Sequence, residues 1–159
     1  MAESTRIFIH GLDSSNKGTK AVFFRERYPD MIIPTFKGSL LERMKSLDNI
    51  LSDKSGIRLV GSSFGGLMAA LFAAEHQSVV EKMILLAPAI NFMEFADRQN
   101  EIISVPVWIY HGIADDVIPL AEVETIAKKI FSNLSFNALD DDHLLHKTFQ
   151  ALDWGSLLS

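Results

Sequence analysis

Short apolar segments alternate with longer segments of helical periodicity along this chain, and this alternation limits the possible folds more than any other feature. It predicts βαβ units, in which helices cross over between parallel strands. The expected strands are apolar throughout, as is typical of a sheet that helices cover on both faces. We predict about six mainly parallel strands, over residues 6–10, 31–33, 57–60, 82–86, 105–110 and 134–139. The expected fold class is therefore α/β, with three layers.

Helices are expected between these strands and after the last one, over residues 17–28, 39–51, 64–76, 120–131 and 143–152. Right-handed crossovers bring the loops that follow the strands to one edge of the sheet, where ligands usually bind. The chain has 159 residues, which is the size of one domain. No repeat, low-complexity tract or linker divides it, so we expect a single domain over residues 1–159.

Composition and charge narrow the classes of protein to which the chain can belong. The formal net charge is −5, which argues against nucleic acid as a partner because nucleic-acid-binding surfaces carry clustered Lys and Arg. The chain has no cysteine, which removes disulfides and thiolate metal ligands. Its longest apolar stretches are about half of the roughly 20 residues that span a bilayer, and no signal peptide is visible. We therefore expect a cytoplasmic protein, and the sequence does not indicate its oligomeric state.

The segment Gly61-Ser62-Ser63-Phe64-Gly65 follows a predicted strand and opens a predicted helix. A G-x-S-x-G pattern in this context is typical of a nucleophile elbow, in which a strained turn projects the central serine above the sheet. The positions two residues before and after Ser63 favour glycine, because larger side chains there would collide with neighbouring strands. Gly and Ser also make ordinary turns, but the position between strand and helix favours Ser63 as a nucleophile.

An acidic turn follows the strand expected at residues 105–110. Asp115 lies in this loop, where its carboxylate could orient a histidine from the next loop and stabilise the imidazolium. Asp also commonly occupies turns that precede helices, so the pattern alone leaves both interpretations open for Asp115. Asp116 is the alternative acid.

Two histidines follow the last predicted strand and are the candidates for a general base. His143 lies at the expected junction between loop and helix, whereas His146 lies one turn further on, inside the expected helix. A base must be neutral near pH 7, as an unperturbed histidine mostly is. We favour His143 because of its position at the junction between loop and helix, with His146 as the rival.

The run Asp140-Asp141-Asp142, together with the two histidines that follow it, could also suggest a metal site. No second cluster of ligands in the sequence would complete a tetrahedral or octahedral shell, so we expect no metal. An acidic run of this kind is more typical of a solvated turn.

The first predicted strand ends in His10-Gly11-Leu12. Glycine at position 11 would let this loop approach the reaction centre, so that the N–H of Leu12 donates to an oxyanion together with the N–H of Phe64. His10 and His111 both precede a glycine at the end of a strand. We interpret them as structural loop histidines, since one base is sufficient.

Together these motifs resemble the α/β-hydrolase superfamily along nearly the whole chain. The matching pieces occur in the order of that superfamily, with the nucleophile before the acid and the acid before the histidine. They are His10-Gly11-Leu12, residues 61–65, His111-Gly112-Ile113-Ala114-Asp115 with Pro119, and Asp142-His143. Residues 9–15 look like the start of small, cap-less bacterial serine esterases. The resemblance implies a triad of Ser63, Asp115 and His143. It also implies an oxyanion hole formed by the N–H groups of Leu12 and Phe64.

Two departures from the pattern of this superfamily affect the expected site. Larger members begin with an antiparallel hairpin that has no counterpart before Arg6, and many carry a large cap where this chain has only the 16 residues 89–104. We therefore expect a short flap and an open, shallow site. Phe92, Met93 and Phe95 in this flap are the candidates for packing an acyl or aromatic group of a substrate.

The resemblance implies a serine hydrolase that cleaves carboxylic esters of small or medium acyl groups through an acyl-enzyme, without a cofactor. The expected partner is then a small-molecule ester. A thioesterase or an amidase would use the same residues, and a binding or signalling module could keep the fold with little turnover. A complete set of nucleophile, acid and base favours an enzyme, because a binding module has no use for all three.

Overall fold

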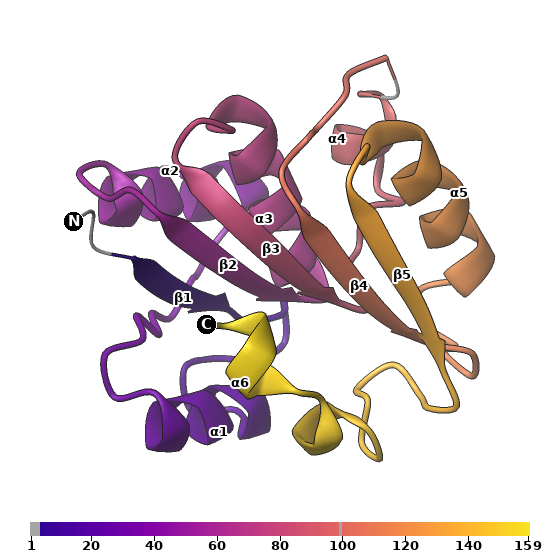
Figure 1. The fold of residues 1–159 in the computed structure, drawn as a ribbon, viewed down its shortest axis with the longest axis horizontal. Coiled ribbons are helices and arrows are strands. Elements are labelled where there is room, and N and C mark those ends of the chain that lie inside the picture. Colours follow the sequence, from indigo (N-terminus) through magenta and orange to yellow (C-terminus); the bar gives the residue numbers. More distant parts are fainter. Residues whose placement is uncertain (1–3, 99) are drawn as a thin grey trace.

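Five parallel strands form a single sheet in the computed structural model, which describes residues 4–98 and 100–159 (Figure 1). The strands are β1 (Thr5–Ile9), β2 (Ile57–Ser62), β3 (Val80–Leu86), β4 (Val107–Gly112) and β5 (Leu134–Leu139). They lie in chain order, and each pairs in parallel with the next. The carboxyl ends of all five strands therefore meet at the same edge of the sheet.

Helices cover both faces of the sheet and complete the predicted three layers. One face carries α2 (Leu40–Leu51), α3 (Phe64–Glu75), α4 (Met93–Ala96) and α5 (Leu120–Ile130). The other carries α1 (Thr19–Arg27) and a C-terminal segment with a 3-10 turn at Phe149–Ala151 and α6 (Trp154–Leu157) (Figure 1). Four of the five predicted helices are present, and their ends agree with the prediction to within two residues. None of the helices in the described residues has the length and apolar character of a membrane span.

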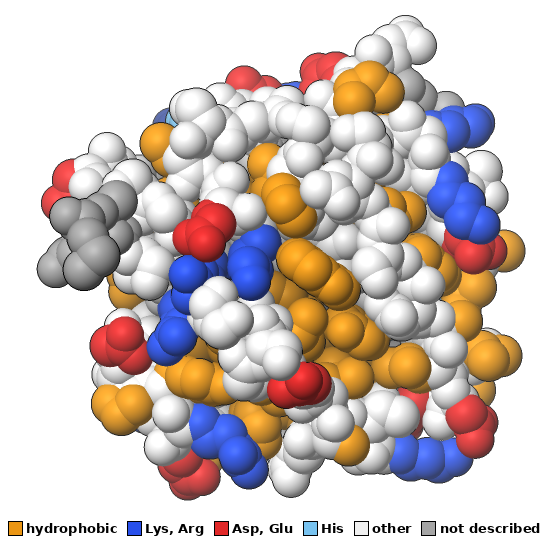
Figure 2. Space-filling view, in the orientation of Figure 1, with side chains coloured by type: hydrophobic (Ala, Val, Ile, Leu, Met, Phe, Trp, Pro, Cys, Tyr) orange, Lys and Arg blue, Asp and Glu red, His pale blue; other side chains and the backbone are white. Residues whose placement is uncertain are grey.

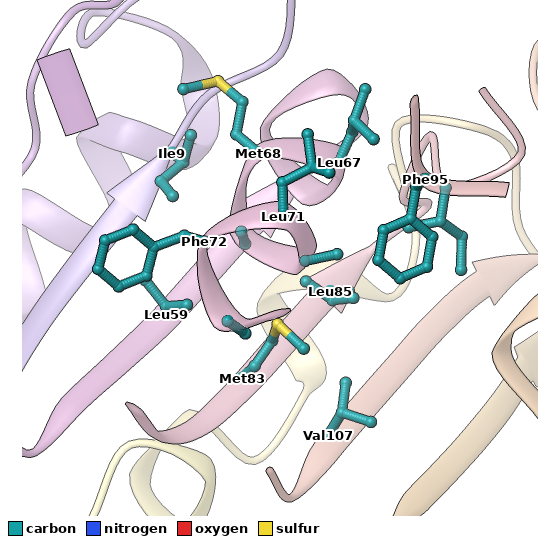
Figure 3. Packing of buried hydrophobic residues seen from close by; sticks show 14 of the residues in the cluster. Ile9, Leu59, Leu67, Met68, Leu71, Phe72, Met83, Leu85, Phe95 and Val107 are labelled. Atoms are coloured by element: carbon teal, nitrogen blue, oxygen red, sulfur yellow. The ribbon is translucent and has the colours of Figure 1, made fainter. Parts of the chain in front are cut away.

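Helix α3 lies at the centre of the larger core. Ten of its twelve residues are buried, so it has no polar face. A helix of this kind is stable only where other elements cover it on every side. Figure 3 shows Leu71 and Phe72 of α3 above Leu59 of β2 and Met83 of β3. This packing holds α3 against β2 and β3.

The second core lies between the opposite face of the sheet, α1 and the C-terminal segment. The ring of Phe24 meets that of Trp154 edge to face, with 4.8 Å between their centroids. The Nε–H of Arg6 and the Nη1–H of Arg58 both donate to the carbonyl of Leu158, at 3.0 and 2.6 Å. Figure 2 shows a group of Lys and Arg side chains beside this segment, and exposed apolar side chains over the neighbouring strands. These contacts tie the C-terminal segment, which follows His143 in the chain, to the sheet.

The strand predicted at residues 31–33 is not a strand in the structure. Ile32 forms an isolated bridge with Ile7. Two hydrogen bonds support it, from the Phe8 N–H to the Ile32 carbonyl (3.0 Å) and from the Ile32 N–H to the Arg6 carbonyl (2.9 Å). Pro34 has no N–H and therefore ends the pairing. The sheet has five strands for this reason, and not six.

The terminal helix predicted at residues 143–152 is also wrong. Asp141 is 3% exposed, and its carboxylate accepts hydrogen bonds from the Lys147 N–H (3.1 Å), the Thr148 N–H (2.8 Å) and the Thr148 hydroxyl (2.7 Å). These bonds fold the segment into a compact loop, in which Leu145 has a left-handed φ of 54° that interrupts a helix. Burial alone would raise the pKa of Asp141, but the hydrogen bonds outweigh burial and lower this pKa to about 2. The acidic run is therefore not a solvated turn throughout.

Candidate active site

A cavity of about 680 Å³ opens at the carboxyl edge of the sheet. The loop after each of the five strands contributes residues to its lining, as does the start of α1. Its volume lies within the range of about 300–1,000 Å³ that is typical of small-molecule sites. Five site residues predicted from the sequence line it together: Leu12, Ser63, Phe64, Phe92 and His143.

Ser63 occupies the sharp turn between β2 and α3. Its φ of 55° lies in the left-handed region, which residues other than glycine rarely adopt. Neighbouring backbone groups hold it there, because its N–H donates to the Leu86 carbonyl at 2.9 Å and its carbonyl accepts from the Ala89 N–H at 3.0 Å. The strained turn is thus fastened to the end of β3 and to the loop that follows it.

The glycines on either side of Ser63 are required by close backbone contacts. A Cβ at Gly65 would lie 2.0 Å from the Ile9 carbonyl oxygen of β1. A Cβ at Gly61 would lie 2.4 Å from the Gly65 carbonyl oxygen. The predicted collision with a neighbouring strand is therefore correct for Gly65, whereas the collision at Gly61 involves the first turn of α3.

Ser63, His143 and Asp115 form one chain of contacts, although 80 residues separate Ser63 from His143. The distance from His143 Nδ1 to Asp115 Oδ2 is 2.7 Å, and that from His143 Nε2 to Ser63 Oγ is 3.1 Å. A carboxylate only accepts hydrogen bonds, so the Nδ1–H of His143 donates to Asp115. Nε2 then accepts the proton of the Ser63 hydroxyl. General-base activation of a serine requires this arrangement.

The carboxylate of Asp115 is fully buried and held at both oxygens. Its Oδ1 accepts hydrogen bonds from the N–H groups of Val117 (2.9 Å) and Ile118 (2.8 Å). Its Oδ2 accepts from His143 and also lies 3.1 Å from Nε2 of His111. His111 Nε2 and the N–H groups of Val117 and Ile118 thus hold the carboxylate of Asp115 with its Oδ2 pointed at His143. Asp116, the alternative acid, is exposed.

His111 is a second buried imidazole beside the same acid. Its Nε2–H donates to the Ile118 carbonyl at 2.8 Å, which places the proton on Nε2. Its Nδ1 is buried without a hydrogen-bond partner among the described residues. Burial lowers the pKa of His111, against the Ile118 hydrogen bond and the charge of Asp115, which act to raise it. His111 therefore supports the acid loop as a neutral side chain, and its spacing of four residues from Asp115 is the sequence signal for this contact.

His146, the rival base, also lines the cavity, but its side chain bonds Asp142, and the Ser63 hydroxyl is bonded by His143 instead. His146 is exposed, and its Nδ1 is 2.5 Å from Asp142 Oδ2. The hydrogen bond from His146 is the main cause that lowers the pKa of Asp142. Within residues 4–98 and 100–159, no three His, Asp or Glu side chains are arranged so that they could hold a metal ion.

The loop after β1 runs directly against the nucleophile. A Cβ at Gly11 would lie 3.5 Å from the Cβ of Ser63. His10 holds this loop, because its Nδ1–H donates to the Gly11 carbonyl at 2.7 Å and its Nε2 accepts the Phe36 N–H at 2.8 Å. The Gly11 carbonyl and the Leu12 N–H belong to one planar trans peptide and point in opposite directions. The bond from His10 therefore turns the Leu12 N–H to the other side of the loop.

The three flap residues predicted to contact a substrate have different positions. Phe92 lines the cavity, and its ring centroid is 6.2 Å from that of Phe64. Met93 is 72% exposed and lies outside the lining, and Phe95 is completely buried, where it stacks on Phe131. Because α4 is a helical turn, it directs Phe95 into the core and Met93 to solvent. The expectation for Met93 and Phe95 therefore does not agree with the structure.

Lys20 is a cavity residue that no sequence motif indicated. It lies near the start of α1, and its Nζ donates to the Leu144 carbonyl at 2.7 Å. Burial lowers its pKa, and the carboxylates of Asp142 and Asp141 act in the opposite direction. The bond to Leu144 links α1 to the residue that follows His143.

The alpha/beta hydrolase fold family model matches residues 33–129 of the sequence, which is more than half of the chain. The chain belongs to the α/β-hydrolase fold family. The matched part of this α/β-hydrolase includes Ser63 and Asp115 and ends before His143. A comparison with curated protein sequences gives no significant match.

Solved structures with the same fold cover nearly all of this α/β-hydrolase. Mouse alpha/beta hydrolase domain-containing protein 10 is 19% identical, with a TM-score of 0.78, and the match covers 98% of this chain and 90% of the mouse chain. Est1E from Butyrivibrio proteoclasticus, solved with ferulic acid bound, is 16% identical, with a TM-score of 0.79 and coverages of 98% and 87%. The esterase EaEST from Exiguobacterium antarcticum is 13% identical, with a TM-score of 0.79 and coverages of 99% and 91%. At these identities the likeness establishes the fold.

The free energy of unfolding of this α/β-hydrolase is expected to decrease as the pH falls from about 7 toward 5. His10 and His111 are both buried, and burial is the largest cause that lowers the pKa of each. His10 and His111 therefore each take up a proton at a higher pH in the unfolded chain than in the folded chain. The stability that these two neutral, buried histidines contribute is therefore complete above the unfolded pKa of about 6.5. It is lost as the pH falls below that value. Urea unfolding at pH 7, 6 and 5 measures the change.

A His111→Gln variant removes one of the two titrating groups and should lose stability less steeply over this pH range. Leu41→Gln is the matched control, because Leu41 is exposed on α2 and does not titrate, so its replacement should leave the slope unchanged. A wild-type free energy of unfolding that is constant between pH 7 and pH 5 would contradict the prediction.

Proposed function

We propose that this α/β-hydrolase is a serine esterase, with Ser63 as the nucleophile, His143 as the base and Asp115 as the acid that orients the base. The proposal depends on one observation, the continuous contacts from Asp115 through His143 to Ser63 at 2.7 and 3.1 Å. The position of Ser63 in a strained turn at a cavity of about 680 Å³ also supports it.

In the proposed reaction, Ser63 Oγ attacks the ester carbonyl carbon while His143 Nε2 takes the hydroxyl proton. The tetrahedral intermediate then collapses, and the imidazolium gives this proton to the departing alkoxide. An acyl-enzyme remains on Ser63, and water attacks it with His143 again acting as the base. The carboxylate of Asp115, held by two N–H groups, stabilises the imidazolium in both half-reactions.

The N–H groups of Leu12 and Phe64 are the proposed donors to the oxyanion. Phe64 is the first residue of α3, so its N–H has no acceptor within the helix. The bond from His10 to the Gly11 carbonyl fixes the orientation of the Leu12 N–H. In a serine hydrolase, one such donor contributes about 3–4 kcal/mol to the stability of the transition state.

Exposed apolar side chains surround the opening of the cavity. Leu12, Phe92, Val117 and Leu144 line it and are 51%, 42%, 63% and 51% exposed. They come from the loops after β1, β3, β4 and β5. Single exposed apolar side chains are ordinary, but a group around one opening is typical of a binding surface. We infer that the uncharged acyl chain of the ester lies across these four side chains, which we call the apolar rim.

Hydrolysis of p-nitrophenyl acetate, butyrate and octanoate tests both the reaction and this substrate class. The wild type is expected to hydrolyse all three esters. Its kcat/KM should rise with acyl length, because each buried CH₂ contributes about 0.8 kcal/mol, or roughly fourfold. A Val117→Ser variant keeps the backbone N–H that donates to Asp115 Oδ1, but it removes apolar surface from the rim. We expect it to lower the ratio of octanoate to acetate hydrolysis by about fivefold.

Ile102→Ser is the matched control for the apolar rim. Ile102 is 60% exposed, like the rim residues, but lies outside the cavity lining, so its replacement should leave the ratio unchanged. Absence of hydrolysis of every ester by the wild type would reject the esterase. Hydrolysis at a rate independent of acyl length would reject the role of the rim alone.

A further inference from the structure

Arg43 of α2 is a buried cation for which the described residues provide no counter-charge. It is 5% exposed, and its Nε–H donates to the Gly38 carbonyl at 3.0 Å. Its Nη1 is buried without a hydrogen-bond partner. No described carboxylate forms an ion pair with it. Because a buried and unpaired charge destabilises a folded protein, the position of Arg43 requires an explanation beyond packing.

The guanidinium of Arg43 lies over the ring of Phe64. Its Cζ is 5.4 Å from the centroid of the Phe64 ring, and the Phe64 N–H is one of the two proposed donors. Its charge also acts on His10, which holds the loop of the other donor. Burial is the main cause that lowers the pKa of His10, and the charge of Arg43 lowers this pKa further. Arg43 thus contacts the ring of the residue that carries one proposed donor, and its charge acts on the histidine that holds the loop of the other.

A second positive feature lies at the start of α3. Helix α3 begins at Phe64, so the positive end of its dipole points to the oxyanion hole, and its first turn contains no acidic residue. Arg43 and this helix end are both positive. A negative charge that forms at the carbonyl oxygen of a substrate bound to Ser63 is attracted to both.

We propose that Arg43 is a fixed positive charge whose counter-ion is the oxyanion of the tetrahedral intermediate. This inference rests on the proposed esterase function. Arg43 does not line the cavity, so it acts on the reacting atoms through its field and not through contact. Its charge favours the transition state over the neutral ester, which affects kcat and leaves KM nearly constant.

Three substitutions separate the charge of Arg43 from its hydrogen bond to Gly38. Arg43→Gln keeps a donor without the charge, Arg43→Lys keeps the charge, and Arg43→Met keeps neither. We expect the Gln and Met variants to lose about tenfold in kcat for p-nitrophenyl butyrate, the size expected of one charge acting over about 12 Å at an effective dielectric constant of about 20. The Lys variant should keep most of the activity. Lys45→Gln, an exposed residue of the same helix, is the control that loses one positive charge without effect.

The thermal midpoint and the binding of an anionic analogue complete the test. Removal of an unpaired buried charge should leave the Tm of Arg43→Met equal to or higher than that of the wild type, although this variant is slower. Butylboronic acid, which forms a tetrahedral anion on an active serine, should bind the Gln variant about tenfold more weakly.

Wild-type kcat in Arg43→Gln would overturn the inference, because the charge would then have no effect. A loss in Arg43→Met that Arg43→Gln restores would also overturn it, since the hydrogen bond to Gly38 would then be the cause. If the wild type hydrolyses no ester, the esterase proposal itself fails, and that result is distinct from both outcomes.

Discussion

Replacement of Ser63 by alanine is expected to lower kcat/KM for p-nitrophenyl butyrate by at least about a thousandfold. No other group in the proposed mechanism can form the acyl-enzyme, and the oxyanion hole alone provides only a small part of the acceleration. The hydroxyl of Ser63 has one hydrogen-bonding contact among the described residues, to His143 at 3.1 Å. Its loss should therefore leave the Tm within a few degrees of the wild-type value, which calorimetry can measure.

Ser62→Ala is the matched control, because Ser62 occupies the variable position of the same G-x-S-x-G motif. This variant should keep activity of the wild-type order. A fluorophosphonate probe should label the wild type and Ser62→Ala but not Ser63→Ala, as read by mass spectrometry. Equal hydrolysis by Ser63→Ala and the wild type would remove Ser63 from the mechanism. Absence of labelling in the wild type would instead favour a binding module that has kept the fold.

Replacement of Gly65 by alanine should have the largest effect on stability, with a loss of about 3 kcal/mol or more. The new Cβ would lie 2.0 Å from the Ile9 carbonyl oxygen and 2.6 Å from that of His10. Both contacts are with backbone at the end of β1, so a side-chain rotation does not relieve them. The first turn of α3 would move away from β1, and Ser63 would move with it. Urea unfolding measures the loss, and hydrolysis of p-nitrophenyl butyrate should fall in parallel.

Gly155→Ala is the control for the effect of a methyl group on a helical glycine. Gly155 lies in α6, and the nearest atom to a Cβ there is Asp153 Oδ1 at 3.7 Å, an ordinary contact. Alanine also favours helix over glycine by up to about 1 kcal/mol, so this variant should be as stable as the wild type or slightly more stable. A Gly65→Ala variant of wild-type stability would show that β1 and α3 do not pack as described.

The layered fold was largely predictable because its signal is local. Alternation of apolar strands and amphipathic or apolar helices identified five strands and four helices, and the order of elements along the chain implied a parallel sheet. The two errors have specific physical causes. At residues 31–33 the strand pattern was correct, but Pro34 ends the pairing after a single bridge. At residues 143–152 the helical pattern was outweighed by the buried carboxylate of Asp141, which binds backbone N–H groups of Lys147 and Thr148.

The positions of the candidate site residues were also predictable, because each follows a strand in a recognisable motif. The structure brings Ser63, Asp115 and His143 together, and their catalytic roles stay proposals that the Ser63 variant tests. The predicted substrate contacts were less successful. Spacing in the sequence could not distinguish Phe92, which lines the cavity, from Phe95, which the turn of α4 directs into the core.

The sequence by itself determined the class of fold and the loops that carry the chemistry, because periodicity and turn motifs depend on neighbouring residues. The tertiary structure alone decided which side chains meet across long separations. A Cβ at Gly112 would lie 2.4 Å from the Asp141 carbonyl oxygen, so the loops of the acid and the base approach as closely as backbones can. The unpaired charge of Arg43 beside Phe64 likewise exists only because α2 packs on α3. Burial and long-range contact depend on the whole packed chain, and no local pattern records them.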